Sequence, residues 1–381
     1  MNDLSLLIKH NTPAKAFSKI KLDHAHFVYI PSTKLIDFNE ILDIIKFIHS
    51  IYQKYGRIPL PVELRLGSAQ FADKLTITLL ECICQHIILF HNQDVKLQMH
   101  PPSSISTEGI YSSPLQLLTS PKLATRKMYP SKFELEIYKN HYRRVCSAND
   151  IIGTSFLSKV FDDIVTFQLP FDINEADRET IAEILVELVG NACEHTHADC
   201  LLDIDITNNY NKKNTPGDFF GINISIVNFS EQLFSHAIES KFLSSSSPLP
   251  NARYEYVKQA HQNHIGFFNS TYLPDDFFTI AAFQHKISGR TQSSLTGGTG
   301  LTKLVKGIQL RSDAHRCFMN TGYRRLAFLP KYLEYNSDDW IGFNESNNFL
   351  DSPPDTTLFE SSTLYIPGTA YNLTFVMKKG S

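Results

Sequence analysis

The chain has 381 residues, of which 42% are hydrophobic and 20% are charged, and its formal net charge is -3 at neutral pH. This length predicts two or three structural units, and the hydrophobic content is enough for a full core. The near-neutral charge gives no argument for binding to nucleic acid or to an anionic membrane surface.

The 6 cysteines form no disulfide framework for a chain of this length and include no CxxC spacing. No apolar run reaches the roughly 18 residues that would predict a membrane-spanning helix. The first residues mix polar and apolar side chains and lack the pattern of a signal peptide. We therefore expect a protein of the reducing cytoplasm without a membrane partner.

The first hundred residues alternate between strand and helix patterns. Residues 62–66 alternate with period two, as a strand does, and residues 38–56 have the spacing of an amphipathic helix that ends at Gly56. The predicted strands are 26–30, 62–66 and 94–99, and the predicted helices are 38–56 and 73–92. This alternation predicts a small sheet covered by helices, so we expect residues 1–100 to form a small α/β domain.

Residues 101–165 are predicted to be a linker with connecting helices. The stretch 101–125 is rich in proline and serine, which favours a boundary or a long loop. From Tyr129 to about Phe167 the pattern favours helix, and Leu169-Pro170 then interrupts it.

Residues 166–381 are predicted to form a second, larger domain. A helix restarts near Asn174 and runs through residues 181–197, and strands follow at 200–207 and 220–229. A polar turn, NNYNKKNTPGD, separates the two strands.

The rest of this domain begins with a long insertion at about 231–295, with a helix at 251–262. Insertions of this length often act as lids over a site. The remaining predicted elements are a glycine-rich turn that opens a helix (294–309), strands at 314–320 and 323–330, a loop-rich stretch (331–363) and a last strand (368–379).

The helix at 181–197 carries the main candidate site. Glu187, Asn191 and His195 follow one another at intervals of four residues, so they share one face of the helix. A carboxylate one turn from an amide suits a nucleotide site, because the amide oxygen can bind a hard cation such as Mg²⁺ and the carboxylate can deprotonate a water. The alternative is that this face is the solvated side of an amphipathic helix.

A second signal is the glycine-rich turn Gly297-Gly298-Thr299-Gly300-Leu301. Glycines let backbone N–H groups approach an anion closely, and the N-terminus of the following helix favours phosphate. The turn lacks the spacing of a P-loop, and no strand immediately precedes it as a dinucleotide fingerprint requires. A flexible hinge is the alternative interpretation.

A metal site is a rival interpretation of the cysteines and histidines near the end of the helix. His195 and His197 are two residues apart, so their side chains would point away from each other and would not share one ion within a helix. Buried thiols at Cys193 and Cys200 and histidines at the surface are the favoured interpretation.

The order of the predicted elements resembles that of the GHKL superfamily, the ATPases of gyrase and histidine-kinase type. The elements are the ELVGNACEH helix, the strand pair, the long insertion, the GGTGL turn and a last strand starting Gly368-Thr369. The motifs are most similar to those of the anti-sigma-factor serine kinases, whose helix carries both Glu and Asn. The resemblance covers about residues 165–379 and implies a Bergerat-type ATPase domain, an α+β sandwich with helices on one face of a mixed sheet. The strand–helix order of the N-terminal domain is similar to that of STAS domains.

The resemblance implies a role for each matching residue. Glu187 matches the general base and Asn191 matches the Mg²⁺ ligand. His195 matches the end of the helical motif that carries both. Thr369 matches the threonine that contacts adenine through water. The turn that wraps the phosphates is matched by Gly297, Gly298, Thr299, Gly300 and Leu301, and Arg290 just before it is a candidate phosphate contact, with a solvated charge as the alternative.

The sequence departs from the family at the box that recognises adenine. The family has DxGxG after a strand, whereas here Asn228 stands in the place of the aspartate and the glycines are absent. An amide oxygen accepts a hydrogen bond from the adenine amino group with roughly half the strength of a carboxylate.

We therefore expect a protein that binds ATP and Mg²⁺ and hydrolyses ATP slowly, with a nucleotide state that drives lid closure, homodimerisation or regulation of a protein partner through the N-terminal domain. One alternative is a degenerate scaffold that does not hydrolyse ATP. The other is a regulator resembling serine or histidine kinases. Of the two enzymatic hypotheses, protein kinase activity is less favoured than ATP hydrolysis.

Overall fold

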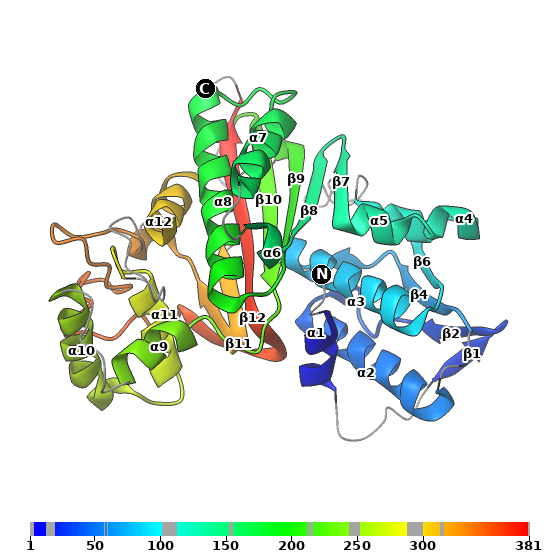
Figure 1. The fold of residues 1–381 in the computed structure, drawn as a ribbon, viewed down its shortest axis with the longest axis horizontal. Coiled ribbons are helices and arrows are strands. Elements are labelled where there is room, and N and C mark those ends of the chain that lie inside the picture. Colours follow the sequence, from blue (N-terminus) through cyan, green and yellow to red (C-terminus); the bar gives the residue numbers. More distant parts are fainter. Residues whose placement is uncertain are drawn as a thin grey trace.

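The structure is a computed structural model that describes residues 4–12, 20–56, 58, 60–100, 113–151, 155–210, 212, 216–243, 252–287, 300–312 and 316–379. These residues form helices and two main sheets, so the predicted α+β fold class is confirmed. Figure 1 shows the N-terminal unit beside the larger sheet, with the long helix α8 (Glu175–Thr196) lying along that sheet.

The N-terminal unit follows the predicted alternation of strands and helices. Its four-stranded sheet pairs β1 with β2 antiparallel and β2, β4 and β6 parallel. Helix α2 begins at Asp37, whose side chain accepts backbone hydrogen bonds from Asn39 and Glu40, and it ends at Gly56 as predicted. The elements are α1 (Leu4–Asn11), β1 (Lys21–Asp23), β2 (His26–Tyr29), β3 (Leu35–Ile36), α2 (Phe38–Tyr55), β4 (Val62–Gly67), β5 (Gln70–Phe71), α3 (Lys74–His91) and β6 (Val95–Met99).

Helix α3 is the core helix that joins this unit to the larger sheet. Within the described ranges it is the one helix long and apolar enough to cross a membrane, but 78% of that stretch is buried inside the protein. Its backbone N–H at Leu75 donates to Oδ1 of Asn372 at 3.0 Å, and the hydroxyl of Thr78 lies 2.6 Å from that of Ser225. The N-terminal unit is therefore packed directly on the larger sheet.

The larger sheet has six strands among the described residues, and every neighbouring pair is antiparallel, so the expectation of a mixed sheet is wrong. In spatial order the strands are β11 (Phe318–Ala327), β12 (Phe359–Lys378), β10 (Phe219–Asn228), β9 (Cys200–Tyr210), β8 (His141–Cys146) and β7 (Leu135–Tyr138).

Both faces of this sheet are covered. Helices α7 (Phe156–Gln168), α8 and α12 (Gly300–Arg311) share one hydrophobic core with Ile222 and Ile224 of β10. Residues of the opposite face, such as Val227 and Leu201, belong to a second core with α2 and α3. The larger domain's own helices α7, α8 and α12 therefore lie on one face of the sheet, as expected, and the N-terminal unit covers the other.

The helix predicted from Tyr129 to about Phe167 is wrong in its middle. Strands β7 and β8 occupy residues 135–146, and β8 pairs with β9 from His141 to Cys146. These strands are stabilised by pairing with a distant strand rather than by local propensity. The neighbouring elements are η2 (Pro114–Thr119), α4 (Leu123–Arg126), α5 (Tyr129–Glu134) and α6 (Ala148–Ile151).

The C-terminal strands differ from the prediction in their bounds. Strand β11 is continuous across the expected break, with irregular register around Gly322, which has a φ of 56°. Strand β12 begins at Phe359, inside the stretch expected to be loop-rich. The insertion and the segment after β11 contain α9 (His236–Leu243), α10 (Ala252–His264), η3 (Ile265–Phe267), α11 (Pro274–Ala282) and η4 (Pro330–Tyr332).

Candidate functional site

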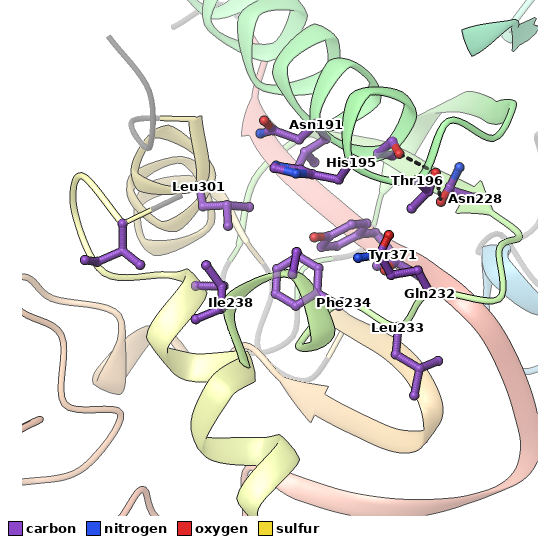
Figure 2. Close-up of a pocket in the computed structure, with 16 residues that line it drawn as sticks. Asn191, His195, Thr196, Asn228, Gln232, Leu233, Phe234, Ile238, Leu301 and Tyr371 are labelled. Carbon is purple, nitrogen blue, oxygen red and sulfur yellow. Dashed lines mark hydrogen bonds between the residues drawn. The ribbon is translucent and has the colours of Figure 1, made fainter. Parts of the chain in front are cut away.

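A cavity of about 80 Å³ lies between the C-terminal half of α8, the end of β10, the middle of β12, and the helices α9, α11 and α12. Its lining is mainly apolar, and Figure 2 shows Asn191 and His195 of α8 on one side and Phe234 and Ile238 on the other. Five residues singled out in the sequence line it: Asn191, His195, Asn228, Leu301 and Thr369.

Helix α8 places the polar groups because its own ends are well defined. Asn174 caps its N-terminus by accepting from the backbone of Asp177, and His197 ends it in the left-handed conformation with a φ of 53°. Its apolar residues, among them Leu185 and Val189, are fully buried in the core below the sheet. The face that carries Asn191 and His195 is thereby turned towards the cavity.

Glu187 does not line the cavity, although it lies one turn from a residue that does. Its Oε1 accepts a hydrogen bond of 3.3 Å from Nδ2 of Asn191, and both side chains are half-buried. The predicted proximity of carboxylate and amide on one helix face is therefore present. The hydrogen bond makes Nδ2 the donor, and the carbonyl oxygen of Asn191 is the atom of this side chain whose chemistry suits a cation.

Asn228 is buried, and the protein fixes the orientation of its amide. Nδ2 donates to the carbonyl oxygens of Ala198 at 3.2 Å and Asp199 at 3.1 Å, so both amide protons are used and the group cannot be reversed. The hydroxyl of Thr196 lies 3.1 Å from Oδ1 of Asn228 and 2.7 Å from the carbonyl oxygen of Ala192. Because an amide oxygen can accept two hydrogen bonds, Oδ1 can accept one from a ligand in the cavity as well as one from Thr196.

Thr369 lies beside Asn228 because β10 and β12 pair these two positions. The preceding Gly368 has a φ of 83°, and a Cβ atom there would lie 2.3 Å from the carbonyl oxygen of Asn228. Only glycine permits this close approach of the two strands. The glycine before Thr369 is therefore required by the pairing of β12 with β10.

The predicted phosphate-binding turn is only partly described. Arg290, Gly297, Gly298 and Thr299 lie outside the described residues. Gly300 is the first residue of α12, as predicted for a turn that opens a helix, and Leu301 after it lines the cavity.

Several residues of the lining, notably Tyr371, Phe234 and Ile238, were not predicted from the sequence. Tyr371 could have been found, since it is two residues after Thr369 and the side chains of a strand alternate between faces. Burial raises the pKa of the Tyr371 phenol, which therefore stays protonated and can act as a donor. Phe234 and Ile238 come from the insertion, and only the tertiary structure brings them to the site.

The described residues contain no group of three or more His, Cys, Asp or Glu side chains arranged to hold a metal ion. All six cysteines are free and buried. A hydrogen bond with Cys193, together with burial, raises the pKa of Cys200 well above its usual value, which disfavours a thiolate ligand. For Mg²⁺, the amide oxygen of Asn191 is a donor of the right type, and such an ion usually keeps several waters and binds substrate phosphates.

No protein-family model matches the chain, and neither a curated protein nor a solved structure matches it. Arguments about function therefore depend on the residues of the cavity and on their geometry.

Proposed function

We propose that the chain binds ATP with Mg²⁺ at the cavity beside α8 and hydrolyses it slowly. The observation that supports this most strongly is the convergence of Asn191, Asn228, Leu301 and Thr369 on one cavity from four separate segments of the chain. The GHKL resemblance assigns all four to nucleotide binding from motifs alone. A merely solvated helix face would not be expected to meet the other three motifs.

The described side chains suggest a role for each part of the site. Oδ1 of Asn228 would accept a hydrogen bond from the amino group of adenine, and Thr369 beside it would contact the adenine ring through water. The amide oxygen of Asn191 would hold Mg²⁺, which would neutralise phosphate charge. Glu187, hydrogen-bonded to Asn191, would take the proton of an attacking water.

The small size of the cavity has a consequence for binding. Small-molecule sites usually have volumes of about 300–1,000 Å³, whereas this cavity has about 80 Å³. Phe234 and Ile238 occupy the side opposite α8 (Figure 2). We therefore propose that nucleotide binding displaces the segment from Phe234 through α9.

A scaffold that does not hydrolyse ATP is the second candidate. It is favoured by the same small volume and by Asn228, an uncharged residue where the resembling family has an aspartate. In that case the domain would bind nucleotide weakly, and its role would be to present the N-terminal unit to a partner protein.

Isothermal titration calorimetry with ATP and Mg²⁺ separates these candidates. The full chain is compared with Asn191→Ala and with a control, Asn39→Ala, which removes an amide near the start of α2, far from the cavity lining. Binding that requires Mg²⁺ and is lost only in Asn191→Ala supports the proposal. Absence of heat in the wild type overturns it in favour of the scaffold.

Turnover is tested separately with Glu187→Gln, which keeps the size of the side chain and removes its basicity. The proposal expects this variant to bind ATP as the wild type does and to release phosphate far more slowly. Equal rates of phosphate release would exclude Glu187 as the base.

The setting of this activity is also part of the proposal. Six buried free thiols suit the reducing cytoplasm. The N-terminal unit packs on the sheet that carries Asn228 and Thr369, so it is suited to pass the nucleotide state to a protein partner, and a homodimer would be one such partner.

A further inference from the structure

A second cavity lies on the opposite face of the six-stranded sheet. It has a volume of about 290 Å³ and lies between the N-terminal end of α3 and strands β9 to β12. Strand β12 separates the two cavities, because Thr369 and Tyr371 line the first and Asn372 and Thr374 line the second. The second cavity is thus distinct from the proposed nucleotide site.

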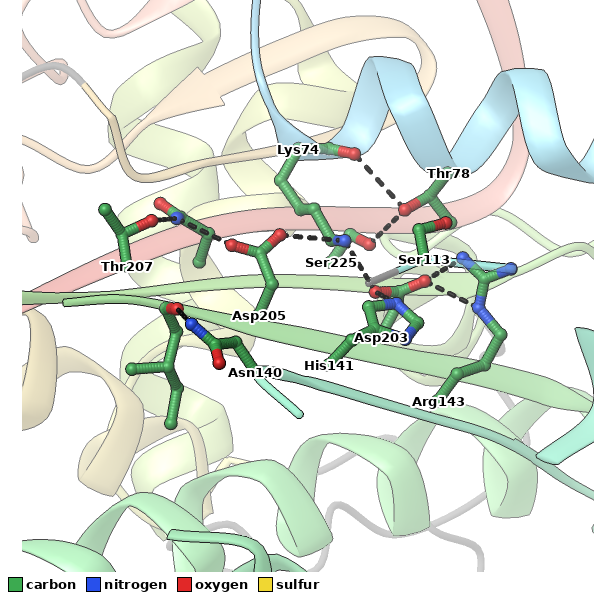
Figure 3. A network of polar contacts seen from close by, with 12 residues as sticks. Lys74, Thr78, Ser113, Asn140, His141, Arg143, Asp203, Asp205, Thr207 and Ser225 are labelled. Atoms are coloured by element: carbon green, nitrogen blue, oxygen red, sulfur yellow. Dashed lines mark hydrogen bonds and ion pairs between the residues drawn. The ribbon is translucent and has the colours of Figure 1, made fainter. Parts of the chain in front are cut away.

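The floor of the second cavity is polar, and the protein satisfies it. Asn223 donates to Asp205 at 3.0 Å and accepts from the hydroxyl of Thr374 at 3.2 Å. Figure 3 shows the amino group of Lys74 between two carboxylates, at 2.9 Å from Asp205 and 2.7 Å from Asp203. The floor carboxylate is therefore already neutralised and does not call for a cationic ligand.

Backbone N–H groups at the N-terminal end of α3 also have hydrogen-bond partners within the protein. The backbone N–H groups of Leu75 and Thr76 donate to the side chains of Asn372 and Asp73. A ligand of this cavity would therefore have to be recognised by side chains of the wall rather than by the helix N-terminus.

Two arginines on that wall still have hydrogen-bonding capacity. The guanidinium of Arg325 lies 3.7 Å from the ring centre of Phe318, and its nearest carboxylates, Asp73 and Glu360, are 3.7 and 3.9 Å away. Its Nε is buried without a hydrogen-bond partner. Arg316 makes no ion pair with any carboxylate in the described part of the chain, and its guanidinium lies 5.7 Å from the ring of Tyr210.

A guanidinium stacked on an aromatic ring keeps its edge available for two parallel hydrogen bonds to an oxyanion. We infer that the second cavity binds a small organic oxyanion, a phosphate or carboxylate compound, through Arg325 and Arg316. Its volume of about 290 Å³ is near the lower end of the range for small-molecule sites. The bound anion would lie between the N-terminal end of α3 and β11.

Calorimetry of the full chain in a chloride buffer tests this inference, with inorganic phosphate in one titration and succinate in another. We expect at least one of the two anions to bind, and the one that binds identifies the class. Arg316→Gln and Arg325→Gln should each weaken binding by about tenfold or more. Arg316 is exposed, so its variant tests the site even if Arg325→Gln is destabilised.

Two controls separate this site from other causes. Arg65→Gln removes an arginine whose exposure, 27%, is close to the 29% of Arg325, but which lies in the N-terminal sheet outside the cavity, and it should bind the anion normally. Asn191→Ala should also bind the anion normally, whatever its effect on ATP. Binding that is unchanged in both arginine variants, or absent for both anions, would overturn the inference.

Discussion

The two faces of the six-stranded sheet are both buried, but by different means. Towards α8 the strands present apolar side chains, such as Ile222, Ile224 and Ile226 of β10. Towards the N-terminal unit β8 and β9 present Arg143 and Asp203, both fully buried. One face is thus held by hydrophobic burial, and the other depends in part on paired charges.

The charged face forms one connected network beneath α3. Asp203 accepts hydrogen bonds from Arg143 and pairs with Lys74, while Arg143 also pairs with Glu81 of α3. His141 lies 2.9 Å from Asp203 (Figure 3). Burying such charges is costly, so the network is a weak source of net stability. We interpret its role as fixing how α3 docks on the sheet, because Lys74 and Glu81 of α3 pair with Asp203 and Arg143 of the strands.

The largest effect is expected from Arg143→Met. This change leaves Asp203 and Glu81 buried without their guanidinium partner, and removal of one member of a buried ion pair costs about 3–5 kcal/mol. Urea unfolding measures the loss. The matched control is Arg144→Met, because Arg144 is the next residue of β8, faces α7 and pairs with Asp163, whose side chain is 29% exposed.

The control should lose less, because Asp163 keeps contact with water after its partner is removed, whereas Asp203 and Glu81 are fully buried. Equal losses in the two variants would contradict the contrast between the faces.

The charged face also predicts a specific dependence of stability on pH. Burial alone would raise the pKa of Asp203, but Arg143, Lys74 and His141 hold it well below its usual 3.8. A carboxyl whose pKa is lower in the folded than in the unfolded chain stabilises the fold above its unfolded pKa. This contribution is lost as the pH falls from the unfolded pKa through the folded pKa. The stability difference between the wild type and Asp203→Asn should therefore shrink below about pH 4. A difference that stays constant from neutral to acid pH would show that the charge of Asp203 is not the cause.

The alternation of β9 shows how far sequence reasoning could go. Leu202, Ile204 and Ile206 alternate with Asp203 and Asp205, which predicts a strand with one buried face and, in an antiparallel sheet, a solvated one. The strand is correct, but the polar face is buried by the N-terminal unit. No local pattern carries that information, because the docking depends on contacts between distant segments.

In the candidate site too, some residues were predicted from the sequence and others were found only in the structure. Glu187, Asn191 and His195 could be placed from helical spacing, whereas Thr369 was assigned by the family resemblance alone. Their convergence with Asn228 was implied by the family resemblance and is present in the cavity lining for Asn191, His195, Asn228 and Thr369. The α9 side of the cavity was not foreseen, because its residues come from an insertion without a motif.

A smaller effect is expected from Gly368→Ala on the α8 side of the sheet. The residue has a φ of 83°, and the new Cβ would meet the backbone of Asn228 at 2.3 Å. Strain of this kind costs about 1–3 kcal/mol, and it should also weaken ATP binding by moving Asn228. The control is Gly322→Ala, with a φ of 56° but only the flexible side chains of Leu233 and Tyr365 nearby. Thermal unfolding should rank Gly368→Ala as the less stable variant, and the reverse order would refute the close-approach argument.

The smallest effect is expected from Lys303→Ala, which removes an exposed ion pair between α12 and α8. Lys303 lies 2.9 Å from Glu183, and the two side chains are 51% and 50% exposed. Such pairs contribute about 0–1 kcal/mol and are screened by salt, whereas α12 is held to α8 by buried residues such as Leu304 and Ile308. Urea unfolding at low and high salt should therefore hardly distinguish the variant from the wild type. A loss comparable to that of Arg143→Met would mean that the helical face also depends on charge, and the contrast between the two faces would fail.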